Sequence, residues 1–227
     1  MTDRPILFSA PMVRALLDGR KTQTRRVLSG VPEWCGTDRK PGYSCLTPPG
    51  HIEFRGHYPG DAEVEAGFGS KFIKLRFQKG DRLYVREAWR AARSLDQVKP
   101  RDIPRDADIE HEATARSYAE IGLTGRQRPG IHMPRWASRL TLLVTEVRVE
   151  RLQDCSEADA IAEGIVEYEP TNEDPAEFAY VDGGDIWNNA RSAYQALWNS
   201  INGPGAWDAN PWVVAITFTV EKRNIDQ

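Results

Sequence analysis

Lys21, Thr24 and Arg26 place an amine, a hydroxyl and a guanidinium within one short stretch of the chain. A threonine hydroxyl becomes a nucleophile when a base takes its proton, and a neutral lysine can act as that base. An arginine can hold a phosphate, because its planar fork of donors keeps its charge at any relevant pH. The stretch therefore has the groups for acyl transfer or for phosphate binding. The alternative is that Lys21 only complements a helix end and Thr24 is an ordinary strand residue.

A helix before Gly19 and a strand after it would position these groups. Ser9 and Pro11 favour a helix start, and the apolar residues that follow them repeat at helical spacing. Gly19 suits the left-handed conformation that ends many helices. Side chains alternate between the two faces of a strand, so we expect Thr24 and Arg26 to point the same way.

The spacing Gly19-x-Lys21-x-x-Thr24-x-Arg26 resembles the signature of the ASCH domains, a branch of the PUA-like β-barrel superfamily. Residues 131–139 and 205–212 are similar to stretches of the longer ASCH-like proteins that bacteriophages and prophages encode.

This resemblance implies an α+β fold in which helices pack around a PUA-like mixed β-barrel. We expect one domain over residues 1–227, with two long loop-rich insertions at about 29–70 and 93–130.

The resemblance also implies a chemistry. In one branch of the family, the positions of Lys21 and Thr24 belong to an amidohydrolase that removes the acetyl group from N4-acetylcytidine. The position of Glu163 resembles an acidic residue assigned to catalysis there. This carboxylate could orient Lys21 or pass a proton to the leaving amine. A solvated acidic helix face is the alternative for Glu163, and Glu87 is a rival carboxylate.

Several arginines near these motifs are candidate phosphate contacts, and a neighbouring tryptophan could stack on a base, as readers of single-stranded RNA commonly do. For the tryptophan the alternative is a place in the core. The predicted binding residues are Arg20, Arg25, Arg26, Arg135 and Trp136.

Three classes of function stay open. The chain could bind RNA or a modified nucleoside without chemistry, or hydrolyse an acylated nucleoside or RNA in the same cleft. A ribonuclease would need a general base, and no histidine pair is evident. A protein that binds a host regulator is the third class, because residues 156–187 hold ten Asp or Glu and no Lys or Arg.

Composition and charge limit these classes only weakly. The net charge of −3 gives no global indication of nucleic-acid binding, but residues 1–30 hold six Lys or Arg against two Asp or Glu. Three cysteines and the lack of an apolar leader indicate a reducing, cytoplasmic location without membrane contact. The sequence indicates no cofactor and does not determine the oligomeric state.

One group of residues raises the question of zinc. Cys35 and Cys45 are separated by nine residues, whereas the cysteines of structural zinc sites usually lie two to four residues apart. With His51 and His57 they are therefore interpreted as unpaired loop residues, and we predict no metal site.

Periodicity and capping signals predict the main elements. The predicted strands cover residues 5–9, 22–27, 72–77, 82–89, 135–152 and 212–220, and the predicted helices cover residues 10–17, 109–121, 157–163 and 186–202.

Overall fold

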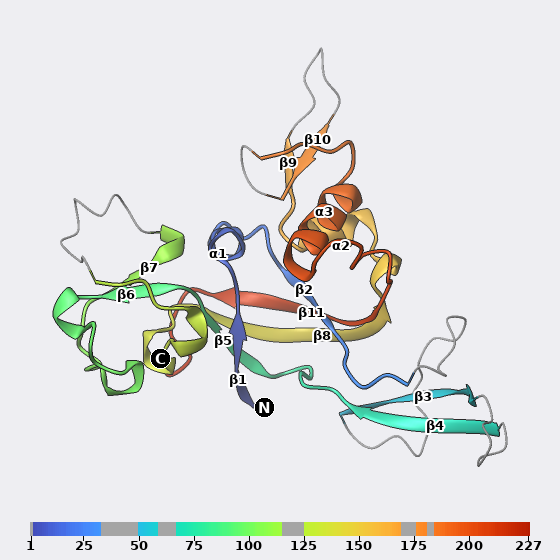
Figure 1. The fold of residues 1–227 in the computed structure, drawn as a ribbon, viewed down its shortest axis with the longest axis horizontal. Coiled ribbons are helices and arrows are strands. Elements are labelled where there is room, and N and C mark those ends of the chain that lie inside the picture. The colour runs from blue at the N-terminus through green and yellow to red at the C-terminus, as the bar shows by residue number, and fades with distance from the viewer. Residues whose placement is uncertain (1, 33–49, 59–66, 115–124, 169–175, 181–183) are drawn as a thin grey trace.

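Five strands form the central sheet of the computed structural model (Figure 1). The structure describes residues 2–32, 50–58, 67–114, 125–168, 176–180 and 184–227. The order across the sheet is β1-β5-β8-β11-β2, in which β1 and β5 run parallel and all other neighbours run antiparallel. These strands are β1 (Asp3–Leu7), β2 (Gln23–Val27), β5 (Arg82–Arg86), β8 (Thr141–Arg151) and β11 (Trp212–Glu221).

Strands β1 and β2 are the two edges of this sheet. No backbone ladder joins them within the described residues, so this part of the chain forms an open sheet and not a closed barrel. The expected α+β class is confirmed, whereas the expected barrel closure is not found.

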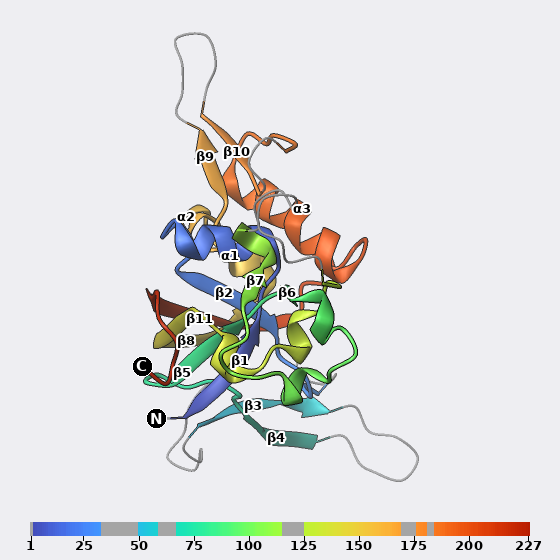
Figure 2. The same cartoon turned by 90° about the vertical axis from the view of Figure 1, so that its left-hand side faces the viewer.

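Three helices lie above the sheet in the two views, and the strands β3 (His51–Tyr58) and β4 (Gly67–Lys74) lie below it (Figures 1 and 2). The helices are α1 (Ala10–Leu17), α2 (Glu157–Ala162) and α3 (Ala190–Asn202). Ser156 and Asp159 form a capping box at the start of α2, which lies within the predicted helix over residues 157–163. Ser9 is the N-cap residue of α1, but its side chain makes no capping hydrogen bond.

Helix α3 starts later than predicted. Trp187 exchanges two backbone hydrogen bonds of 2.9 Å with Phe178, and this extended pairing keeps it out of the helix. Asn189 is the N-cap, and its side chain accepts a hydrogen bond from the Ser192 amide. Residues 186–189, which the helical spacing of apolar residues assigned to a helix, therefore precede α3, and Trp187 forms a β-bridge instead.

The first predicted insertion contains a packed hairpin. Strand β3 (His51–Tyr58) pairs with β4 (Gly67–Lys74), and the β3 side chains Ile52 and Phe54 are buried in the main core. The interpretation of residues 51–58 as loop was therefore wrong. The alternation of apolar and polar residues over 51–54 was a signal for this strand, but it is short and lies among glycine and polar residues.

The second predicted insertion carries short elements. Strand β6 (Trp89–Ala91) pairs with β7 (Ile109–His111), so the predicted helix over residues 109–121 is wrong at its start. Glu112–Thr114 forms a 3₁₀ turn, and residues 115–121 of that prediction lie outside the described residues. The remaining 3₁₀ turns are Arg93–Leu95, Pro100–Asp102, Gly130–His132, Arg135–Ala137 and Leu152–Asp154.

A third hairpin, β9 (Val166–Tyr168) with β10 (Glu177–Ala179), lies in the acidic stretch of residues 156–187. It packs near α3, where a second core cluster forms. The main core lies between the sheet, α1 and the β3–β4 hairpin, and a third cluster surrounds Trp89.

Candidate nucleic-acid interface

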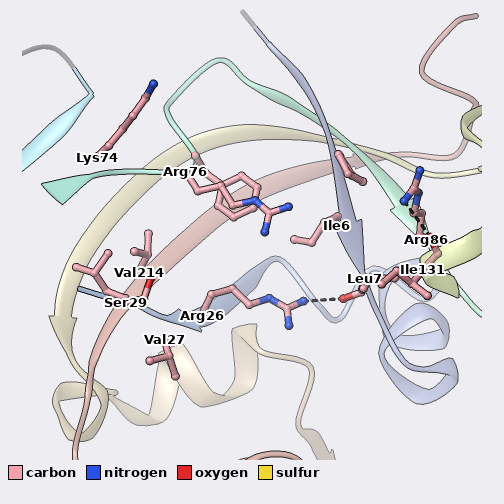
Figure 3. A pocket seen from close by; sticks show the side chains of 13 residues that line it. Ile6, Leu7, Arg26, Val27, Ser29, Lys74, Arg76, Arg86, Ile131 and Val214 are labelled. Atoms are coloured by element: carbon pink, nitrogen blue, oxygen red, sulfur yellow. Dashed lines mark hydrogen bonds between the residues drawn. The ribbon is translucent and has the colours of Figure 1, made fainter. Parts of the chain in front are cut away.

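A side chain joins the two edges of the central sheet. Arg26 on β2 extends towards β1, where Nη2 donates a hydrogen bond of 2.6 Å to the carbonyl oxygen of Leu7 (Figure 3). The Arg26 guanidinium carbon also lies 5.3 Å from the centre of the Phe8 ring, within the range of a cation–π contact. The Arg26 side chain therefore connects the two edge strands β1 and β2. In a closed barrel, backbone hydrogen bonds would connect them.

A cavity of about 510 Å³ lies along this seam (Figure 3). Ligand pockets typically enclose about 300–1,000 Å³, so the space is large enough for a nucleotide-sized ligand. Leu7, Val27 and Ile131 line it and are 44%, 53% and 58% exposed, which makes them three of the most exposed large apolar side chains described. We call this space the seam cavity; its apolar lining is Pro5, Ile6, Leu7, Val27, Leu28, Phe77, Ile131 and Val214.

Four cationic side chains also line the seam cavity, and no carboxylate is among its lining residues. None of the four forms an ion pair with a carboxylate in the described part of the chain. Arg86 Nη1 donates to the Ile131 carbonyl oxygen at 3.2 Å, and Nη2 donates to Tyr84 Oη at 3.3 Å. The cations are Arg26, Lys74, Arg76 and Arg86. Unneutralised cations beside an apolar surface favour an anionic ligand with a flat apolar part.

Lys21 and Glu163, two of the predicted catalytic residues, contact each other in a buried position. Lys21 Nζ donates to the Glu163 carbonyl oxygen at 2.7 Å and lies 2.8 Å from Glu163 Oε2. The two residues are 0% and 4% exposed. Burial lowers the pKa of Lys21 below its ordinary value. The charge of Glu163 acts in the opposite direction, but its effect is smaller than that of burial. The lowered pKa suits a general base, yet Lys21 lines none of the three cavities described here.

Thr24 faces a much smaller space. It is 3% exposed and lines a cavity of about 70 Å³ together with Glu163 and Tyr194. That volume is far below the lower limit for small-molecule pockets. Burial, followed by the charge of Glu163, raises the pKa of the Tyr194 phenol, so this group stays neutral. In this conformation the predicted catalytic residues form a buried polar cluster with no room for a nucleoside.

Arg25 is the centre of a buried network and does not face the seam. Its Nε and Nη2 donate to Glu150 Oε1 at 3.0 and 2.8 Å, and Nη1 donates to Gln23 Oε1 at 2.6 Å. It also lies 3.3 Å from Glu163 Oε1 and 3.3 Å from Asp159 Oδ1. These contacts use its whole fork of donors, so the structure gives Arg25 a place in the core instead of at a phosphate.

Of the other predicted binding residues, two arginines form ion pairs and the tryptophan lines a cavity. Arg20 pairs with Asp18 at 3.0 Å. Arg135 lies 2.6 Å from Asp3 and also pairs with Asp226, which ties the two ends of the chain together. Trp136 lines a second cavity beside the seam cavity.

The alternative catalytic carboxylate, Glu87, is bound to an arginine side chain. It accepts hydrogen bonds from Arg139 Nε and Nη2 at 2.9 and 3.1 Å, and it is 2% exposed. This bidentate pair joins the segment between β5 and β6 to the segment before β8 and uses both oxygens of the Glu87 carboxylate.

Three of the seam cations were missed by sequence reasoning. Lys74 and Arg76 belong to the alternation of apolar and basic residues over positions 72–77, a pattern that predicts a strand but no ligand site. Arg86 follows the apolar core of β5 and had no distinguishing local signal. They lie beside Arg26 because segments far apart in the sequence, namely β4 with the turn after it and β5, both line the seam cavity.

Comparisons of the chain with protein-family models, curated proteins and solved structures gave no match. The resemblance to ASCH domains therefore stays a hypothesis from the motifs.

Two further predictions concern metals and membranes. Cys35 and Cys45 lie outside the described residues, and among those that are described no three His, Cys, Asp or Glu side chains are placed to hold a metal ion. A search of the same residues finds no helix with both the length and the apolar character needed to cross a bilayer.

Proposed function

We propose that the seam cavity binds a nucleotide, with the base against its apolar lining and the phosphate on its cationic side chains. The observation that carries this proposal is the composition of the lining, in which four cations are accompanied by no carboxylate. Arg26, Arg76 and Arg86 can each offer a guanidinium fork to phosphate oxygens. The exposed Leu7, Val27 and Ile131 provide an apolar surface for a base.

The sequence motif supports the same class of ligand. Gly19, Lys21, Thr24 and Arg26 follow the ASCH pattern, and the implied family is a group of PUA-like barrels associated with RNA or modified nucleosides. In this proposal the open sheet corresponds to such a barrel with one unpaired seam, bridged by Arg26 and available to a ligand. The alternative of a binding module without chemistry is therefore the one we favour.

Hydrolysis of N4-acetylcytidine by Lys21, Thr24 and Glu163 stays a prediction. It requires an opening of the small cavity beside Thr24, because the space there is about 70 Å³. A ribonuclease in the seam cavity would require a general base, and no histidine is among the residues that line it.

Calorimetric titration with nucleoside monophosphates and the corresponding nucleosides tests the binding proposal. We expect the monophosphates to bind more tightly, and increasing salt to weaken their binding. The variant K74A/R76A should bind the monophosphate about tenfold or more weakly, equivalent to about 1.4 kcal/mol. Both side chains are exposed, so the variant is expected to fold.

The matched control is K71A/K79A. These lysines are also exposed and belong to β4 and the turn after it, but they do not line the seam cavity. Equal weakening by the two double variants would refute a specific site at the seam, as would the absence of any binding by the monophosphates.

A further inference from the structure

A second cavity continues from the seam cavity. It has a volume of about 900 Å³ and is lined by residues 99–105 and 131–134 together with Arg86 and Trp136. Arg86 and Ile131 line both cavities, so the two spaces meet at these side chains. We call the second space the flank cavity and the two together the groove. The 3₁₀ turn Pro100–Asp102 and the segment after it build its wall.

The flank cavity repeats the charge pattern of the seam cavity. It adds Lys99, Arg101 and Arg105 to the cations of the groove, and Asp102 is the one carboxylate among the lining residues. Asp102 lies 3.7 Å from Arg101, so it neutralises part of one charge. The groove is therefore strongly cationic although the whole chain carries a net charge of −3. A polyanion fits this distribution better than a single charged group does.

Arg86 occupies the junction between the two cavities. No described carboxylate pairs with it, and its buried Nε has no hydrogen-bond partner. Its Nη1 and Nη2 donors are occupied only by the long contacts to Ile131 and Tyr84. A buried guanidinium donor without an acceptor is costly, and a phosphate oxygen would satisfy it. The junction is thus suited to the phosphate that links two nucleotides.

Trp136 gives the flank cavity an aromatic surface. Its side chain is half-buried and lines the space beside His132 and Met133. Stacking of bases on aromatic side chains is the usual way in which proteins hold single-stranded nucleic acid without reading every base. Each cavity exceeds the lower limit of about 300 Å³ for a small-molecule pocket, so each has room for at least one nucleotide.

We infer that the groove binds a single-stranded oligonucleotide, with one nucleotide in the seam cavity, the following phosphate at Arg86 and the next nucleotides in the flank cavity. This inference rests on the proposed function and names its ligand as a polynucleotide instead of a free nucleoside. It also gives the second insertion a role, because residues 99–105 belong to it.

Fluorescence anisotropy with RNA and DNA oligomers of one, two, four and eight nucleotides tests the inference. Affinity should rise at least about tenfold from the monomer to the tetramer, because the nucleotides in the two cavities are then covalently linked and the second one binds intramolecularly. In R101A/R105A this gain should disappear, whereas the affinity for the monomer should stay unchanged. The slope of log K against log salt should fall by about 1.4 for two lost phosphate contacts. The comparison of RNA with DNA oligomers shows whether the 2′-hydroxyl contributes.

The control for this variant is R93A/R126A. These two arginines are exposed, belong to the same insertion and line neither cavity, so their removal changes the overall charge equally. A similar loss of tetramer binding in both variants would overturn the inference. A monomer that binds as tightly as the octamer would also overturn it, while leaving the proposed function intact.

Two other outcomes are decisive. If neither monomer nor oligomer binds, the inference and the proposed function both fail. An acidic peptide of eight glutamates that binds as tightly as the octamer would replace a nucleic-acid ligand with a protein ligand and overturn the inference.

Discussion

Lys21 Nζ lies 2.8 Å from Glu163 Oε2, and the two side chains are 0% and 3% exposed. Lys21 stands between the end of α1 and the start of β2, while Glu163 is the C-cap residue of α2. The ion pair therefore links two elements that are far apart in the sequence. Arg25 Nη1 lies 3.3 Å from the other oxygen of the same carboxylate, so Glu163 compensates two buried cations.

Lys21→Met should destabilise the protein strongly. The change leaves the Glu163 carboxylate buried with one of its two cations removed, and breaking a buried pair in this way typically costs about 3–5 kcal/mol. Urea unfolding at pH 7 measures the loss. Arg20→Ala is the control, because the pair of Arg20 with Asp18 is exposed and should contribute about 1 kcal/mol or less. Equal losses in the two variants would contradict a structural role for the buried pair.

Gly164→Ala should cost more stability than Gly19→Ala. Both glycines have positive φ angles, +101° and +78°, which L side chains rarely adopt. A methyl group at Gly19 would meet no atom within 4 Å, so only the backbone strain of about 1–2 kcal/mol applies. At Gly164 a Cβ would lie 3.1 Å from the Ala15 Cβ and 3.2 Å from the Lys21 Cβ. This crowding should add about 1–3 kcal/mol.

Thermal unfolding of the two glycine variants gives the comparison. The midpoint of Gly164→Ala should be lower than that of Gly19→Ala, which in turn should be lower than that of the wild type. A Gly164→Ala protein as stable as Gly19→Ala would show that the segments around Ala15 and Lys21 can move apart without cost.

Phe54→Ala should remove a core contact from the β3–β4 hairpin. Phe54 is 2% exposed, and its ring centre lies 5.3 Å from that of Trp212 in an edge-to-face arrangement. Truncation of a buried phenylalanine typically costs about 3–5 kcal/mol. Phe72→Ala, on the partner strand but 39% exposed, should cost about 1 kcal/mol or less. Denaturant unfolding of both variants decides whether the hairpin belongs to the cooperative core.

The elements that the sequence predicted well depend on residues close together in the chain. The predicted helix over residues 157–163 begins at the capping box of Ser156 and Asp159, which spans one helical turn. The predicted helix before Gly19 ends at this glycine, whose φ angle is positive. The start of α3 was wrong because Trp187 pairs with Phe178, a contact that helical periodicity does not report.

The candidate site was predicted only in part, for a similar reason. Lys21 and Glu163 were assigned to one site through the family resemblance, and the structure brings them together. Their burial depends on how α2 packs against β2, and no local sequence pattern predicts this packing. The groove, in contrast, combines Arg26 on β2, Arg86 on β5 and Arg76 in the turn after β4 with an insertion that has no regular period.

Asp159→Asn should reveal the contribution of one carboxylate to stability through its pH dependence. Burial alone would raise the pKa of Asp159, but hydrogen bonds from Ser156 and the charge of Arg25 lower it below its usual range. Arg148 Nη2 and Gln23 Nε2 also donate to Oδ1, at 2.9 and 3.1 Å. A carboxylate whose pKa is lowered by folding stabilises the native state above its unfolded pKa of about 3.9. This stabilisation is lost as the pH falls through the lower folded pKa.

The wild type should therefore exceed Asp159→Asn in the free energy of unfolding by about 1–3 kcal/mol at pH 7, as expected for hydrogen bonds to a charged group. The difference should shrink as the pH falls below about 4, because the unfolded wild type then binds a proton at Asp159 that the folded carboxylate does not bind until a lower pH. Urea unfolding at a series of pH values between 7 and 2.5 measures both quantities. Asp208→Asn, at an exposed carboxylate, should change stability by no more than about 0.5 kcal/mol throughout. A difference for Asp159→Asn that stays constant down to the lowest pH would mean that its hydrogen bonds, and not its charge, stabilise the fold.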